Sequence, residues 1–486
     1  MSKPSQELTG NYSQELKRTM KLFSSFAVAF SFISITTGIF TNYGFVLNTA
    51  GPAGIWMWPI VTIGHLIIAL IFGELAGRIP FSGYSYQWVS RLANRGMGWF
   101  AGWVAIVFLI IVVPTIDYGL APIIAQLLGW EASPQILALI VVATLVLQAL
   151  INIFGVRLAT RLNDTAVYTE VVGIVGIIVI LGAVVILAGK ADWSMLSNVG
   201  QSVTNSGGSY LGAFLLAGLM GSYTLVGFEA AANLSEETID AKKNVPKAMI
   251  LSVMLSGGIG FIFLVVISIS IGNLDVISSS GSPLSEILKS HLGSVVAVIF
   301  LVLCIISIFA CGLISMASAS RLVYAMSRDN VFFASAFFRK ITKRGSVPGN
   351  AIVLVLVLGI LAVLFSDSLT LLVGATAVLP AVLYLITILT YAFKQKHLPK
   401  VDSFSLGKWR KSVTAAAIIW LIFEICILTI PSDFNKVAIV AAILLVLGAV
   451  VYFLFFRKGI LEGRIGMKLE EDKTSIVTSS QQTKNM

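Results

Sequence analysis

Apolar runs long enough to cross a membrane recur along almost the whole chain. A spanning helix needs roughly 20 mostly apolar residues, because the hydrocarbon core of a bilayer is about 30 Å thick. Such runs follow one another from Lys21 to Arg457 without a long polar linker. They predict an all-α integral membrane protein with twelve transmembrane helices, at residues 22–46, 53–77, 97–128, 135–154, 164–188, 209–233, 247–272, 292–327, 350–366, 369–393, 410–430 and 436–456.

The composition agrees with a lipid environment. Of the 486 residues, 57% are hydrophobic and 12% are charged, whereas soluble domains have about 45–50% apolar and about 25% charged residues. We therefore expect one transmembrane domain at 22–456, between an N-terminal tail at 1–21 and a C-terminal tail at 457–486. No nucleophile–base constellation and no metal-ligand pattern stands out, so we do not expect an enzyme or a metal site.

Lysine and arginine are confined almost entirely to one set of loops. If the N-terminus lies in the cytoplasm, 30 of the 33 basic residues fall in the tails or in cytoplasmic loops, and only Lys190, Lys289 and Lys436 do not. This distribution follows the positive-inside rule, and it predicts that both termini are cytoplasmic. Basic loops facing an anionic lipid leaflet also account for the net charge of +10 without a nucleic-acid partner. We expect a bacterial inner membrane.

Two of the predicted helices contain Gly, Ser and Thr at mid-membrane depth. They are the first helix, at Ser34 to Phe40, and the sixth, at Gly218 to Glu229. Glycine weakens a helix by about 1 kcal/mol, and Ser and Thr offer the freed backbone other hydrogen bonds. Irregular backbone inside a membrane is tolerated only where it lines a cavity or is buried in protein. The alternative is that each cluster is a packing patch between unbroken helices.

The two interrupted helices are five helices apart. This spacing favours two repeats of five helices, at 22–188 and 209–393, followed by two extra helices at 410–456. An odd number of helices inverts the second repeat, so both interruptions would meet near the midplane. The N-termini of the half-helices would attract an anion, and the carbonyls at their C-termini would attract an ammonium group or a cation. A zwitterion fits both.

Five motifs, in order along the chain, resemble the amino acid–polyamine–organocation (APC) superfamily of secondary carriers. They are residues 37–40, residues 72–80 with 82–86, residues 98–103, residues 227–229 with 236–238 and 244–248, and residues 320–329. The stretch from Ser34 to Gly38 looks more like the amino acid/choline branch, which includes GABA and choline permeases. The resemblance implies a LeuT-like five-plus-five inverted repeat with helices 1 and 6 broken, two extra helices, and alternating access.

The resemblance also implies a substrate site. The substrate carboxylate would meet N–H or hydroxyl groups of the first break, at Ser34, Thr36, Thr37 and Gly38. The substrate amine would meet carbonyl groups of the second break, at Ser222, Tyr223 and Thr224, and Gly227 would also belong to the substrate site. Phe228 would form an apolar wall.

Four carboxylates near these segments have expected roles. Glu170 matches a position where some relatives carry a lysine that replaces a sodium ion, so it would couple transport to a proton, with sodium as the alternative ion. The other reading of Glu170 is a neutral buried carboxyl bonded to Ser315 or Ser318 of helix 8. Glu229 would pin the half-helix that follows the second break, or else steer the substrate amine. Glu236 and Glu237 would pair with cytoplasmic basic residues to close an inner gate; the alternative is that they are plain solvated charges.

These features together predict a secondary transporter for an amino acid or a related amine, with no cofactor other than the coupling ion. Uptake would be coupled to protons. Two alternatives remain: an exchanger with the same fold and no ion coupling, and a nutrient sensor derived from a transporter.

Overall fold

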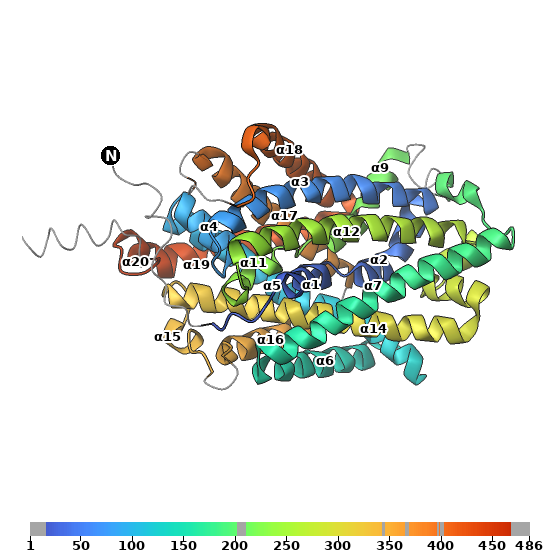
Figure 1. Cartoon of the computed structure of the whole chain (residues 1–486), viewed down its shortest axis with the longest axis horizontal. Coiled ribbons are helices and arrows are strands. Elements are labelled where there is room, and N and C mark those ends of the chain that lie inside the picture. Colours follow the sequence, from blue (N-terminus) through green and yellow to red (C-terminus); the bar gives the residue numbers. More distant parts are fainter. Residues whose placement is uncertain are drawn as a thin grey trace, which may run out of the picture.

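The computed structural model describes residues 16–201, 210–342, 346–364, 369–395, 398 and 403–467. Long helices lie side by side along the longest axis of the molecule (Figure 1). Within the described residues the regular elements are helical, apart from one isolated β-bridge between Met20 and Thr238. Most of the two predicted tails, 1–15 and 468–486, lies outside the described residues.

The first half of the chain forms helices before and after the first break. They are α1 (Leu22–Ile33), α2 (Ile35–Ala50), η2 (Pro52–Trp56), α3 (Met57–Arg78), α4 (Tyr84–Leu92), α5 (Arg95–Leu128), α6 (Pro134–Phe154), α7 (Val156–Leu187) and η3 (Trp193–Ser197).

The second half contains the second break and the final pair of long helices. Its elements are α9 (Tyr210–Leu216), α10 (Gly218–Thr224), α11 (Ala230–Asn233), η4 (Ser235–Glu237), α12 (Ala241–Ile269), α13 (Leu274–Ser278), α14 (Pro283–Arg328), α15 (Ser335–Phe338), α16 (Gly349–Leu364), α17 (Leu369–Lys394), η6 (Gly407–Trp409), α18 (Arg410–Thr429), η7 (Ser432–Phe434), α19 (Asn435–Val451), η8 (Tyr452–Phe456) and α20 (Arg457–Leu461).

Ten helical segments among the described residues are long and apolar enough to cross a membrane. Two of the twelve predicted spans correspond to shorter apolar helices, Tyr210–Thr224 and Gly349–Leu364. The first of these is short because the second break ends α10 at Thr224. The multi-pass membrane class is therefore confirmed, whereas the number twelve and the inverted repeat stay predictions.

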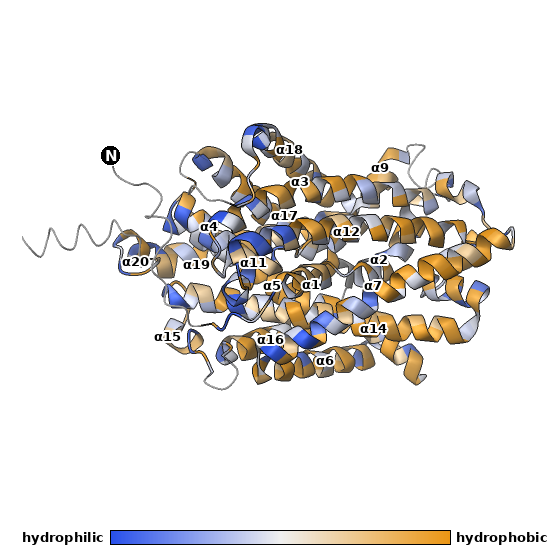
Figure 2. Cartoon of the chain, viewed as in Figure 1, coloured by the Kyte–Doolittle hydropathy of each residue, from blue (hydrophilic) through white to orange (hydrophobic). Residues whose placement is uncertain are grey.

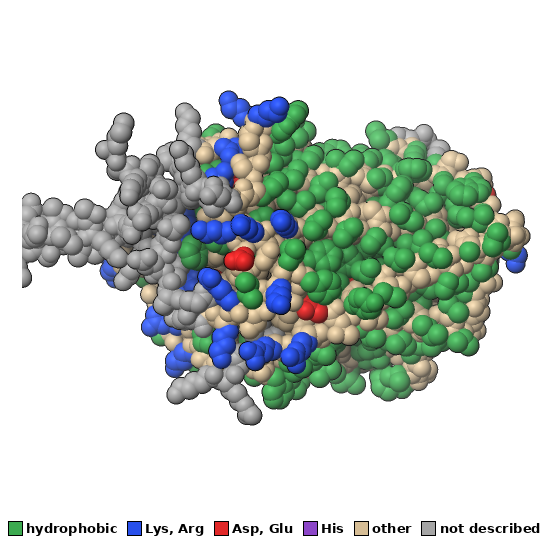
Figure 3. Space-filling model, in the orientation of Figure 1, with side chains coloured by type: hydrophobic (Ala, Val, Ile, Leu, Met, Phe, Trp, Pro, Cys, Tyr) green, Lys and Arg blue, Asp and Glu red, His purple; other side chains and the backbone are tan. Residues whose placement is uncertain are grey.

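The outer surface of the bundle is apolar over most of its length. Large hydrophobic side chains are exposed there, as at Ile63 (60%) and Val179 (62%), and Figure 2 shows hydrophobic residues along nearly all the long helices. Lys and Arg side chains gather at the end where α4, α11, α15 and α20 lie (Figures 1 and 3). An apolar band with a basic end is the surface that a bilayer with an anionic leaflet requires.

Short helical pieces, not continuous rods, occupy the middle of the bundle. α1 packs against α7, α12 and α14, and α2 packs against α10 and α14. The long helices α5, α12 and α14 therefore surround the two breaks, and irregular backbone is kept away from lipid.

Candidate functional site

The first break lies at Ser34, between α1 and α2. Its backbone has φ 38° and ψ 92°, a conformation that non-glycine residues rarely adopt. The Ser34 N–H donates to the Phe30 carbonyl at 2.9 Å, and the Ser34 Oγ accepts from the Thr37 N–H at 3.3 Å. Ser34 therefore ends α1 and caps the N-terminus of α2. The sequence predicted the interruption in this helix correctly.

Glu170, from the middle of α7, places its carboxyl at the same point. Its Oε1 atom accepts from the Thr36 N–H at 3.2 Å, lies 2.8 Å from the Thr36 hydroxyl and 3.3 Å from the Ser34 hydroxyl. Ser307 of α14 completes the cluster, with its Oγ 2.6 Å from Thr36 Oγ1. Glu170 is 2% exposed. The positive end of α2, where a substrate carboxylate was expected, thus holds a carboxyl of the protein itself.

The serine partners expected for Glu170 were wrong. Ser315 Oγ donates to the Cys311 carbonyl at 2.8 Å, and Ser318 Oγ accepts from Asn233 at 2.6 Å. The serine beside Glu170 is Ser307, about 12 Å further back along the α14 axis than Ser315. The sequence identified the correct helix but misjudged the depth of Glu170 by about two turns.

The second break runs from Leu225 to Glu229, between α10 and α11. Gly227 has φ 88°, and a Cβ atom there would lie 1.8 Å from Phe32 Cδ1, so both backbone and space require glycine. The Tyr384 hydroxyl, from α17, accepts from the Gly227 N–H at 3.4 Å and donates to Glu229 Oε2 at 2.7 Å. Glu229 is 2% exposed, and this hydrogen bond fixes the start of α11.

The two breaks touch each other. A Cβ atom on Gly38 would lie 1.8 Å from Thr224 Oγ1, so α2 and α10 approach as closely as two backbones with small side chains allow. Phe228 packs against Phe72 and Tyr384, with ring centroids 5.8 and 5.7 Å apart. The structure brings together and buries the predicted substrate residues, which are Ser34, Thr36, Thr37, Gly38, Ser222, Tyr223, Thr224, Gly227 and Phe228.

Polar groups at this junction still have capacity for a ligand. Within the described part of the chain, Ser222 Oγ and Tyr223 OH are buried and have no hydrogen-bond partner. Buried polar atoms are usually paired, and an unpaired one indicates a strained, catalytic or ligand-binding position. Their role as substrate contacts stays a prediction.

Ion pairs lie at the basic end of the bundle, beyond the second break. Glu237 pairs with Arg321 at 2.8 Å, and each side chain is 1% exposed. Glu236 pairs with Arg328 at 3.0 Å and also accepts from the Ser82 N–H at 3.1 Å. Both arginines come from the end of α14, so these contacts tie the segment after α11 to that helix.

The segment before α1 is tied to the same place. The Met20 N–H donates to the Glu237 carbonyl at 3.0 Å, and the Ile239 N–H donates to the Met20 carbonyl at 2.8 Å. Backbone hydrogen bonds therefore join the segment before the first broken helix to the segment after the second.

The sequence missed several partners that only the fold brings near. Glu74 does pair with Arg78 at 2.6 Å, as the i,i+4 spacing indicates. It also contacts Arg410 at 2.5 Å and accepts from the Tyr391 hydroxyl at 2.6 Å. Neither Tyr391 nor Tyr384 carries a local motif, so no signal in the sequence pointed to them.

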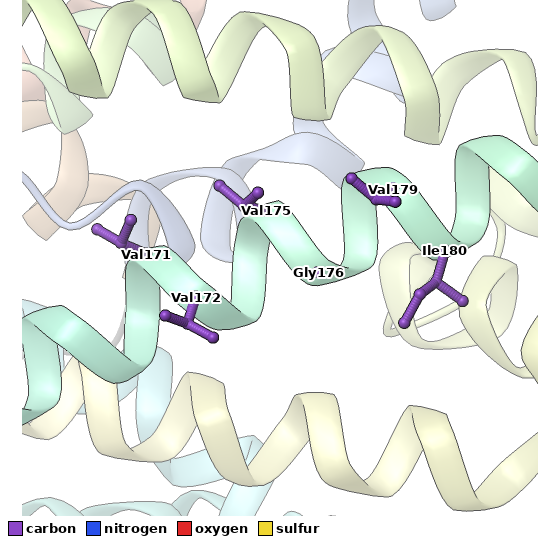
Figure 4. Close-up of a pocket in the computed structure, with 6 residues that line it drawn as sticks. All are labelled: Val171, Val172, Val175, Gly176, Val179 and Ile180. Carbon is purple, nitrogen blue, oxygen red and sulfur yellow. The ribbon is translucent and has the colours of Figure 1, made fainter.

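An apolar groove of about 430 Å³ lies on the outside of α7, next to Glu170 in the sequence. Figure 4 shows its lining, which consists of Val171, Val172, Val175, Gly176, Val179 and Ile180. It offers no polar group to an amino acid, and Val172 is 54% exposed. The groove is therefore separate from the buried polar junction between the two breaks.

The fold and the paired breaks define a multi-pass membrane protein built around two interrupted helices. A family model described as amino acid permease matches residues 20–455. The chain belongs to this family.

Relatives of similar length agree with that assignment. Amino-acid permease BAT1 from Arabidopsis thaliana is 26% identical, over 86% of this chain and 87% of its own length. The BAT1 homolog from Oryza sativa subsp. japonica is 28% identical, over 87% and 86%. An uncharacterized amino-acid permease from Schizosaccharomyces pombe is 28% identical, over 91% and 84%. These relatives are named as permeases, not as enzymes.

Proposed function

We propose that this chain carries an amino acid or a related amine across the membrane by alternating access, coupled to protons through Glu170. The observation that supports this most is the position of the Glu170 carboxyl, which accepts hydrogen bonds from Thr36 and Ser34 at the N-terminus of α2. Membership of the amino acid permease family supports the substrate class.

The geometry suggests how proton and substrate are linked. An ionised Glu170 occupies the N–H groups and the positive dipole end that a substrate carboxylate needs. Two carboxylates at one buried site repel each other, so one of them must be neutralised. A proton on Glu170 removes its charge and weakens its hold on Thr36, and the substrate carboxylate then takes its place. Proton binding and substrate binding therefore favour each other.

The ion pairs at the basic end act as the inner gate in this proposal. The positive-inside rule assigns that end to the cytoplasm, and the pairs of Glu237 with Arg321 and Glu236 with Arg328 hold it closed. Inward opening requires the segment after α11 to part from α14. Both termini lie in the cytoplasm, and the membrane is the bacterial inner membrane.

The coupling is tested by uptake into proteoliposomes with and without an inward proton gradient. We expect the gradient to drive accumulation in the wild type and not in Glu170→Gln, which keeps the size of the side chain but cannot ionise. Glu131→Gln, at an exposed position, is the matched control and should behave as wild type. Accumulation by Glu170→Gln that still follows the gradient would remove Glu170 from the mechanism.

The same vesicles separate the alternatives. Counterflow without any response to a proton or sodium gradient in the wild type would identify an exchanger, and a response to sodium alone would identify sodium as the coupling ion. Binding without transport would identify a sensor.

Competition against a labelled amino acid by alanine, GABA, choline and putrescine identifies the substrate. The resemblance of residues 34–38 to the amino acid/choline branch favours GABA or choline over alanine. Inhibition by alanine alone would place the chain outside that branch.

A further inference from the structure

A second buried pair of ionisable side chains lies outside the two breaks. His65 of α3 and Glu424 of α18 place Nε2 and Oε1 3.6 Å apart, and each side chain is 1% exposed. Along its own helix, each residue is about 20 Å from the basic end, measured from Arg78 or Arg410. Both arginines contact Glu74, so Arg78 and Arg410 lie at the same depth along the bundle. The pair therefore lies deep in the membrane, where ionisable groups are rare and mostly functional.

Other titratable groups on the surrounding helices are engaged elsewhere or exposed. On α17, Tyr384 bonds to Glu229 and Tyr391 bonds to Glu74. Tyr210 of α9 donates to the Ala50 carbonyl, and Lys436 of α19 is exposed. On α10, Tyr223 lies near Cys311 and Asp117, and its hydroxyl has no hydrogen-bond partner among the described residues. In the part of the chain that the structure describes, His65 is the ionisable side chain that pairs with Glu424.

The hydrogen bonds of His65 determine how many protons the pair holds. Its Nδ1 lies 3.1 Å from the Val61 carbonyl oxygen. A carbonyl can only accept, so Nδ1 carries a hydrogen and Nε2 is the atom that faces Glu424. If Nε2 were unprotonated and the carboxyl ionised, a lone pair would face a negative charge. One proton therefore resides on either Nε2 or the carboxyl.

We propose that His65 and Glu424 form a second proton-binding site, which holds one exchangeable proton between Nε2 of the imidazole and Oε1 of the carboxyl. With that proton the pair is neutral overall in either arrangement, which a membrane interior requires. At 3.6 Å the two atoms are just beyond hydrogen-bond distance. A small approach of the two side chains would let the proton cross from one atom to the other without changing the net charge of the site.

Unsatisfied polar atoms next to the pair connect it to the second broken helix. Ser222 Oγ and Trp420 Nε1 lie beside the Glu424 carboxyl but outside hydrogen-bond geometry. Glu424 Oε2 likewise has no hydrogen-bond partner among the described residues. Leaving buried polar atoms unpaired costs free energy, so a purely structural ion pair would not be expected to keep three of them together.

Ser222 belongs to α10, two residues before that helix ends at the second break. A small shift of α10 would bring the Ser222 hydroxyl onto Glu424 Oε2, which favours the ionised carboxyl and moves the proton to His65. Whether the proton resides on His65 or on Glu424 would then depend on the position of α10. This coupling step rests on the proposed alternating access, whereas the proton site itself does not.

The test uses the full-length protein in lipid nanodiscs with ¹⁵N-labelled histidine. The chain has 3 histidines, so His65→Gln assigns the His65 signals by difference. The ¹⁵N shifts show which imidazole nitrogens are protonated, and the infrared carboxylic-acid band lost in Glu424→Gln shows whether Glu424 is protonated. We expect Nδ1 to be protonated and the Nε2 and Glu424 positions to hold one proton in total.

Zero protons or two protons on those positions would overturn the proposal, as would an unprotonated Nδ1. Adding a competing amino acid is expected to shift the His65 Nε2 signal, and an unchanged signal would overturn the coupling to α10. If Glu424→Gln does not fold, the double variant His65→Gln/Glu424→Gln, which keeps two amide partners, supplies the infrared difference.

Glu170→Gln separates this proposal from the transport mechanism. It should leave the His65 spectrum of the substrate-free protein unchanged, because Glu170 contacts the first break, whereas the pair lies between α3 and α18. If proton-driven uptake survives in Glu170→Gln while the His65 pair still holds its single proton, the proposed role of Glu170 fails and the second proton site stands.

Discussion

Gly38 is the residue at which the two broken helices come closest. A Cβ atom there would lie 1.8 Å from Thr224 Oγ1, so Gly38→Ala must push α2 and α10 apart. Overpacking of this kind lowers the free energy of unfolding by about 1–3 kcal/mol. We expect that loss in denaturant unfolding in detergent, together with reduced uptake in vesicles.

Thr224→Gly in the same chain removes the clashing atoms and serves as the matched control. The double variant should regain part of the stability and the uptake. Unchanged stability and uptake in Gly38→Ala alone would show that the two helices do not meet at this residue.

Tyr384 holds the second break from a distant helix. Its hydroxyl donates to the buried Glu229 carboxyl at 2.7 Å, and Tyr384→Phe leaves that carboxyl without this donor. The expected loss is about 1–3 kcal/mol in the free energy of unfolding. Tyr168→Phe, at a side chain that is 67% exposed, should change it little. Equal effects of the two substitutions would contradict the role of Tyr384.

At the scale of elements, Ser34 decides where the first helix breaks. Its side chain caps α2, and its φ of 38° suits glycine better than alanine. Ser34→Ala loses the cap, which lowers the free energy of unfolding by about 0.5–2 kcal/mol. Glycine at an N-cap lowers it by only a few tenths of a kcal/mol. We therefore predict that the free energy of unfolding is highest with Ser at position 34, lower with Gly and lowest with Ala. If Ser34→Ala unfolds with a free energy equal to or higher than that of Ser34→Gly, the proposed helix break at Ser34 is contradicted.

The sequence predicted these elements well where the signal is local. Gly, Ser and Thr at mid-membrane depth indicated both breaks, and the apolar runs located the long helices, because each depends on neighbours within a few residues. The start of α11 was not predictable, since Glu229 there is bonded to Tyr384, 155 residues away in the chain. Ser307 and Arg410 were missed for the same reason. An error of about two turns in depth along α14 changes the serine that meets Glu170 from Ser307 to Ser315.

For the whole molecule, the proposed inner gate predicts that the buried ion pairs at the basic end hold the central junction closed. Arg321→Gln leaves Glu237 buried without its partner, and breaking a buried pair costs about 3–5 kcal/mol. A loss of about 1.4 kcal/mol already changes an equilibrium tenfold. Opening at this end should therefore become more than about tenfold more frequent.

Cys311 can report that opening, because it is 1% exposed and its Sγ lies 3.2 Å from the Phe32 carbonyl at the first break. In a chain carrying Cys304→Ala and Cys426→Ala, Cys311 is the remaining cysteine. We predict faster labelling of Cys311 by a polar thiol reagent in Arg321→Gln. Arg464→Gln, which disrupts the exposed Glu462–Arg464 pair, is the control. Equal rates in both variants would show that the Glu237–Arg321 pair is not a gate.

The central claim is that a proton on Glu170 and a substrate at the first break bind together. It is tested most directly by counting protons when substrate is added to the purified protein in weakly buffered solution containing a pH dye. The account predicts that the wild type takes up protons on binding and that Glu170→Gln binds substrate without this uptake. The same proton uptake in both proteins would contradict it.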